Sequence, residues 1–219
     1  METLHISSVN IQGTPELLVA DHQSVTTSFN KLPVNYDLHL GMDGIIGDSV
    51  YHTDVHGGND KAICCYNIDH FTFWKEKLGF DLSNAAFGEN LSLTGSAALE
   101  EHVYIGNQYQ LGQAVVEVSQ PRQPCYIIGV RHNYKKFVIH IQETGFTGFY
   151  LRTITPGTFN PLDNLILLST HADQISVMSV NNVRYHDTGN IEMLNRLSNL
   201  HALTGSWQEH FGIMLNKLK

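Results

Sequence analysis

The first 168 residues alternate short apolar runs with turns that contain glycine or proline. Val103–Ile105, Tyr109–Leu111 and Ala114–Val118 are such runs, and Gly106 and Gly112 lie between them. Short runs rich in β-branched and aromatic residues, bounded by turn residues, are typical of strands. Many short strands with few helices predict a mainly β fold, either a barrel or a barrel-like sandwich.

Helical spacing of apolar residues is clear in two parts of the chain. Residues 67–78 have it once, with Asn67 as a suitable N-cap and Gly79 as a stop. After residue 168 it recurs in three short segments. We predict a β-barrel domain over residues 1–168 and a three-helix domain over residues 169–219. So small a bundle buries too little surface to be stable alone, so it packs on the barrel or on a partner subunit, which leaves a homodimer open.

Charge and cysteine content exclude several classes of protein. The 21 acidic residues outnumber the 13 basic ones and give a net charge of −8, which argues against binding to a phosphate backbone. No run approaches the roughly 18 apolar residues of a membrane span. The three cysteines include an adjacent pair, Cys64 and Cys65, which we expect to be reduced packing residues of a strand. We therefore expect a cytoplasmic protein that binds neither nucleic acid nor membrane.

Cys125 stands at the end of the run Ser119–Cys125, behind two prolines and an arginine. Proline fixes its own φ and disfavours helix at the residue before it, so this run is predicted to be stiff and extended. Arg122 is three residues away, and a nearby cation favours the thiolate form of a cysteine. A thiolate held in this way can act as a nucleophile, a sulfur carrier or a soft metal ligand. The alternative is that Cys125 is only a small buried hydrophobe.

The segment before the predicted buried strand Ala62–Tyr66 carries acidic and imidazole groups at even positions: Asp48, His52, Asp54 and His56. On a strand they would share one face and could ligate zinc or manganese in a metal-dependent hydrolase. A second interpretation is an anion cradle, in which Gly57 and Gly58 expose backbone N–H groups and Lys61 adds a positive charge. A third is a solvated polar strand edge.

Five motifs, in this order, resemble the MOSC domain, which is named after the C-terminus of molybdenum cofactor sulfurase. They are Gly47–Asp48, His56–Ala62, Phe87–Leu91, Ser119–Cys125 and Thr144–Arg152. The helical tail resembles the extension of bacterial MOSC proteins linked to resistance against N-hydroxylated purines. Each motif alone is weak, but the set is specific and covers most of the chain.

This resemblance implies a MOSC-type β-barrel whose cleft holds a molybdopterin-type cofactor. It implies that Cys125 either ligates molybdenum or carries sulfur as a persulfide, and that Lys61 and Arg122 hold the cofactor phosphate. The other implied contacts are glycine backbones and polar side chains: His56, Gly57, Gly58, Glu89 and Asn90.

Three functions remain at this point. The first is a molybdenum-dependent reduction of N-hydroxylated compounds, such as 6-hydroxylaminopurine, to amines. The second is a sulfur carrier that forms a persulfide on Cys125, and the third is the metal-dependent hydrolase on the aspartate and histidine segment. We favour the first, and the resemblance also lowers the weight of the hydrolase. The sequence contains no dinucleotide fingerprint, flavin motif or iron–sulfur cysteine cluster, so a separate electron-donating reductase is implied.

Overall fold

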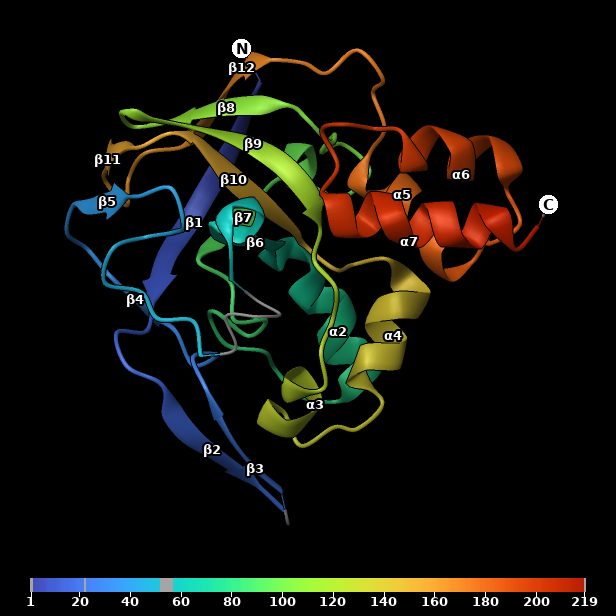
Figure 1. Cartoon of the computed structure of the whole chain (residues 1–219). Helices are drawn as coiled ribbons and strands as arrows, with labels where there is room; N and C mark the ends of the chain where they lie inside the picture. Colours follow the sequence, from blue (N-terminus) through green and yellow to red (C-terminus); the bar gives the residue numbers. More distant parts are fainter. Residues whose placement is uncertain (1, 22, 52–56, 219) are drawn as a thin grey trace.

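The chain is a mainly β protein with a helical group on one side of the sheet (Figure 1). The computed structural model describes residues 2–21, 23–51 and 57–218. In this part of the chain, seven strands close into a barrel, which confirms the predicted β-barrel. In order around the barrel they are β1 (Thr3–Ile11), β7 (Leu91–Thr94), β6 (Ile63–Asn67), β10 (Phe149–Thr155), β9 (Ala114–Pro121), β8 (Gln108–Leu111) and β12 (Leu165–Ser169).

The barrel closes where β1 pairs with β12, with Leu4 opposite Leu165. The pairing of β6 with β7 is parallel, and the other neighbours around the barrel pair antiparallel. Alternate residues of β9 point inward, so Ala114, Val116 and Val118 are fully buried in the core. All five residues of β6 are buried, because this strand is covered on both faces.

Short strands surround the barrel. β4 (Leu32–Pro33) pairs with β1, and β5 (Leu38–Leu40) pairs with β11 (Gly157–Phe159). β2 (Glu16–Ala20) and β3 (Gln23–Thr27) form a two-stranded hairpin that extends away from the barrel (Figure 1).

The predicted helix after β6 is confirmed as α2 (Phe71–Leu78), preceded by the 3-10 turn η2 (Ile68–His70). The side chain of Asn67 accepts a hydrogen bond from Asp69 N, and Gly79 ends the helix at φ +82°. The structure adds two helices that the sequence did not predict, α3 (Ile127–Arg131) and α4 (Phe137–Thr144). The first is too short to show a period, and the apolar, β-branched residues of the second resemble a strand.

Three further helices follow β12, as predicted: α5 (Val177–Tyr185), α6 (Ile191–Ser198) and α7 (Gly205–Asn216). They pack on the barrel, and one cluster of buried side chains runs from the strands into Leu194 and Phe211. Backbone bonds also join the two parts, for example from Thr204 N to Ser119 O at 3.2 Å. The proposed boundary at residue 168 stays a prediction, because the core is continuous across it. No helix among the described residues has the length and apolar character that crossing a membrane requires.

Candidate functional site

A cavity of about 400 Å³ lies where the loop Gly41–Tyr51 faces β6 and the ends of β9 and β10. It brings together three of the predicted cofactor-binding residues, Lys61, Asn90 and Arg122, and it also contains Asp48. The lining also includes apolar residues, among them Phe29, Phe87 and Ile127. A volume of this size and a mixed polar and apolar lining suit a small organic ligand.

Arg122 follows directly on β9, which continues through Pro121, so the predicted extended run is confirmed up to this point. The side chain is 3% exposed, and Nη1 has no hydrogen-bond partner among the described residues. Its guanidinium carbon lies 5.7 Å from the ring centroid of Phe29. Burial by itself lowers the pKa of Arg122, but ionisable neighbours, led by Cys64, more than offset burial and raise the pKa. A buried, charged donor without a partner fits an anionic or acceptor group of a ligand.

Lys61 is a half-buried second cation of the cavity. It ends the 3-10 turn η1 (Asn59–Lys61), and its backbone N donates to Gly58 O at 2.8 Å. Burial lowers the pKa of Lys61, and the Asp60 carboxylate acts in the opposite direction.

The glycines of the predicted anion cradle lie just before η1. Gly58 has φ +97°, a conformation that favours glycine, but neither Gly57 nor Gly58 lines the described cavity. His56 lies outside the described residues, so the cradle as a whole stays a prediction.

Lys31 is a cavity residue that the sequence analysis missed. Its Nζ lies 2.5 Å from Asp48 Oδ2, and Asp48 Oδ1 accepts a hydrogen bond from Gln12 N at 2.8 Å. Asn90 joins this network, because its Nδ2 donates to Asp48 Oδ2 at 2.8 Å and its Oδ1 accepts from Cys64 N at 3.1 Å. The only sequence signal for Lys31 is a lysine next to a short apolar stretch, which is too common to be informative.

These contacts weaken the hydrolase interpretation. Asp48 lies in a loop rather than on a strand, and both of its oxygens have protein partners. His52, Asp54 and His56 lie outside the described residues. Within the described ranges, no group of three or more histidine, cysteine or acidic side chains is placed to hold a metal ion.

Glu89 has a different place from the one expected, because it does not line the described cavity. It is fully buried, with Oε2 accepting from Phe87 N at 3.0 Å and Oε1 from the Ser92 hydroxyl at 2.8 Å. Burial raises the pKa of Glu89, and these hydrogen bonds oppose that shift. Glu89 therefore supports the turn that carries Asn90.

The structure distinguishes the three cysteines. Cys65 is part of the barrel core, as expected, whereas Cys64 lines the cavity beside Tyr150, which corrects its expected role as packing alone. Burial raises the pKa of Cys64 to about 11. Cys125 is half-buried just before α3 and packs against the aromatic cluster around Phe29, outside the lining of the described cavity.

Comparisons with known proteins find two family models along the chain. A sequence model of the MOSC domain matches residues 52–166, and a model of the YiiM-like, 3-alpha helix domain matches residues 175–218. YflK of Bacillus subtilis (strain 168) is 40% identical over 210 residues, which cover 96% of this chain and 94% of YflK.

The crystal structure of YiiM from Geobacillus stearothermophilus is similar to this fold. Its TM-score is 0.81 at 33% sequence identity, with 97% of this chain and 99% of that chain covered. A protein named Reductase, from Gibberella moniliformis (strain M3125 / FGSC 7600), is 30% identical over 165 residues. That match covers 73% of this chain but 28% of the Gibberella protein.

Proposed function

We propose a function from the premise that this chain belongs to the MOSC domain family. The protein binds a molybdenum cofactor in the cavity and reduces N-hydroxylated compounds, such as 6-hydroxylaminopurine, to amines. The observation that carries this proposal is Arg122 Nη1, a buried and unpartnered donor in the part of the chain that the structure describes. Lys61 lies in the wall of the same cavity and adds a second positive charge.

The residues of the cavity fit such a group. Arg122 and Lys61 would hold its phosphate, because charge-assisted hydrogen bonds favour phosphate oxygens. Phe29 and Phe87 add aromatic, apolar surface to the lining of the cavity. When bound, the cofactor supplies two-electron redox chemistry, while the protein binds it, orients it and limits access of water. The Gibberella protein named Reductase supports a redox function for the family.

Cys125 is the proposed ligand to molybdenum. It lies three residues after Arg122, at the position of the family's cysteine, and thiolates are suited to soft metals. The proposal requires a separate electron-donating reductase, because the sequence carries no motif for an electron carrier of its own.

One observation favours the sulfur carrier as the second candidate. Cys125 is half-buried outside the described cavity lining, and its neighbour Tyr126 is 62% exposed. A partly exposed thiol outside the cavity can meet a sulfur donor protein directly. In this candidate, a cysteine desulfurase transfers one sulfur atom from its own persulfide to the Cys125 thiolate, and the desulfurase cysteine leaves as a thiolate.

The test compares the wild type with Cys125→Ser, Cys64→Ser and Cys65→Ser. All four are purified from a host that makes molybdenum cofactor, and the molybdenum, the pterin and the reduction of 6-hydroxylaminopurine with an added electron donor are measured. We expect Cys125→Ser to keep pterin and to lose activity by orders of magnitude, because a serine hydroxyl is a hard, poorly ionised ligand. Cys65→Ser should remain active.

Two results would overturn the proposal. One is full activity in Cys125→Ser, and the other is a wild type that carries neither molybdenum nor pterin. A labile sulfur of about 32 Da on Cys125 after incubation with a cysteine desulfurase, without reductase activity, would establish the carrier instead.

A further inference from the structure

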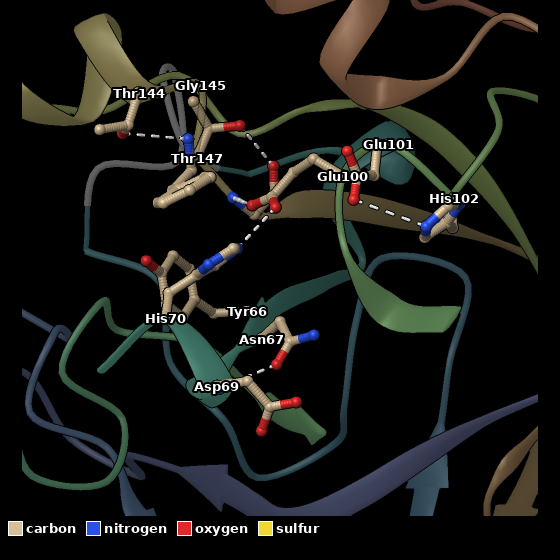
Figure 2. A network of polar contacts seen from close by, with 12 residues as sticks. Tyr66, Asn67, Asp69, His70, Glu100, Glu101, His102, Thr144, Gly145 and Thr147 are labelled. Carbon is tan, nitrogen blue, oxygen red and sulfur yellow. Dashed lines mark hydrogen bonds and ion pairs between the residues drawn. The ribbon is translucent and has the colours of Figure 1, made fainter. Parts of the chain in front are cut away.

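Glu100 is a buried carboxylate outside the cavity lining, in the loop after the 3-10 turn η3 (Ser96–Ala98). Its Oε2 lies 2.8 Å from His70 Nε2, and its Oε1 accepts a hydrogen bond from Gly148 N at 2.8 Å. Figure 2 shows His70 and Glu100 facing each other below the segment from Thr144 to Thr147. At 1% exposure, Glu100 makes both contacts away from solvent.

The backbone of Gly148 links Glu100 to the cavity. Gly148 O accepts hydrogen bonds from Arg122 N at 3.0 Å and from the Thr147 hydroxyl at 2.8 Å. Gly148 has φ +70°, and a Cβ at this position would overlap the carbonyl oxygen of Cys65. The backbone of Gly148 is therefore fixed at two atoms, by Glu100 at its N–H and by Arg122 at its C=O, and the nearby Cys65 carbonyl leaves no room for a side chain.

The helical tail holds the same segment from the other direction. Asn181 of α5 donates from Nδ2 to the Thr147 hydroxyl at 2.8 Å and to Gly145 O at 3.0 Å. In addition, Met178 N donates to Glu100 O at 2.8 Å. The tail thus contacts both the carboxylate-bearing loop and the segment before β10, which ends at Gly148.

We propose that Glu100 is a positioning residue, which fixes the backbone of Gly148 and thereby the backbone of Arg122, so that the guanidinium is directed into the cavity. Arg122 has no protein partner at Nη1 within the described ranges, so its side chain depends on its backbone and on Phe29 for orientation. Small displacements of a group that binds a ligand can reduce its effect by up to about a hundredfold. The consequence for ligand binding rests on the proposed function, but the position of Arg122 does not.

The sequence around Arg122 allows a direct measurement. Pro121 and Pro124 have no amide hydrogen, so a peptide over this run reports on few amides, and Arg122 N–H is the one bonded to Gly148. Amide hydrogen exchange, read by mass spectrometry on the full chain, follows that bond. Peptides from β1 and β12 serve as internal references for global opening.

The variants are Glu100→Leu and Glu100→Gln, with Glu101→Leu and Glu101→Gln as matched controls. Glu101 is the next residue, is exposed and pairs with His102 at 3.5 Å (Figure 2). In Glu100→Leu, the Arg122 amide should exchange at least about tenfold faster, with the reference peptides unchanged. Glu100→Gln keeps a neutral acceptor and should give an intermediate rate. Bound pterin should be lowest in Glu100→Leu and intermediate in Glu100→Gln.

The inference would be overturned if the Arg122 amide exchanged as slowly in both Glu100 variants as in the Glu101 controls. If Glu100→Leu does not fold, the comparison of Glu100→Gln with Glu101→Gln decides, because both variants replace a carboxylate with the same neutral amide. A wild type without pterin would contradict the proposed function and leave the exchange result unaffected.

Discussion

Lys31 Nζ lies 2.5 Å from Asp48 Oδ2, and the two side chains are 6% and 8% exposed. This ion pair connects the segment after β3 to the loop Gly41–Tyr51, and both residues line the cavity. Because Asn90 also donates to Asp48, the pair joins two walls of the cavity and helps to fix its shape.

The first prediction concerns this pair. Asp48→Asn should lower the free energy of unfolding by about 3–5 kcal/mol, because it leaves the Lys31 ammonium buried without a counter-charge. Adding Lys31→Met to Asp48→Asn should restore part of the loss. Urea unfolding measures both. The control is Asp81→Asn, which breaks the exposed pair with Lys75 and should cost no more than about 1 kcal/mol. Equal costs for the two aspartates would contradict a structural role for the buried pair.

The second prediction concerns the proposed phosphate contacts. Arg122→Ala should reduce cofactor retention roughly tenfold to a hundredfold, because a hydrogen bond to a charged group contributes about 1.5–3 kcal/mol. Lys61→Ala should act in the same direction, and both variants should keep the fold. Pterin content after purification is the measurement, with the exposed Lys75→Ala as a control for charge removal. Pterin at the wild-type level in both variants would remove these residues from the site.

The third prediction is an alkaline loss of stability through Cys64. A raised pKa in the folded state means that this thiol stabilises the fold below its ordinary pKa of 9.0 and that the contribution is lost as pH rises towards about 11. The loss should be at most about 3 kcal/mol at the upper end. The free energy of unfolding of the wild type, measured in urea from pH 8 to pH 10.5, should decline more steeply than that of Cys64→Ala. Parallel curves for the wild type and Cys64→Ala would show that the Cys64 thiol is not protected in the folded state.

The fourth prediction concerns the packing of the helical tail. Phe211→Ala should lower the free energy of unfolding by about 3–5 kcal/mol, because Phe211 is fully buried in the core that the barrel and helices share. Ile213→Ala, on the same helix but 49% exposed, should change stability by less than about 1 kcal/mol. Urea unfolding measures the free energy of unfolding of both variants. Similar losses in the two would argue against the packing of α7.

Truncation tests the same packing. Removal of residues 170–219 should expose an apolar surface and lead to aggregation or a changed oligomeric state, visible by light scattering. A truncated protein of unchanged mass in solution and full activity would mean that the tail is an independent appendage.

Local interactions explain which elements were predictable from the sequence. The spacing of apolar residues, the Asn67 cap and the Gly79 stop define α2, and the same periodicity identifies α5, α6 and α7. Pro121 restricts its own φ and disfavours helix at Gln120 before it, so the extended run that ends β9 was also predictable. In each case the forces act between residues a few positions apart.

Two helices depended instead on packing. The residues of α4 have strand propensity, but Phe137 and Ile141 are buried in the aromatic cluster with Trp74 and Phe87, and this burial favours the helical spacing. Propensity differences of a few tenths of a kcal/mol per residue are smaller than the burial of one such side chain.

The sequence alone determined that the chain would form a β-barrel with a helical tail and that Lys61, Asn90 and Arg122 are candidates for one site. Only the tertiary structure decided which cysteine faces the cavity, because β6 is buried on both faces and the pairing of Cys64 with Tyr150 sets its orientation. It also decided that Lys31 pairs with Asp48. Such contacts join segments that are distant along the chain, and the closure of the barrel brings them together.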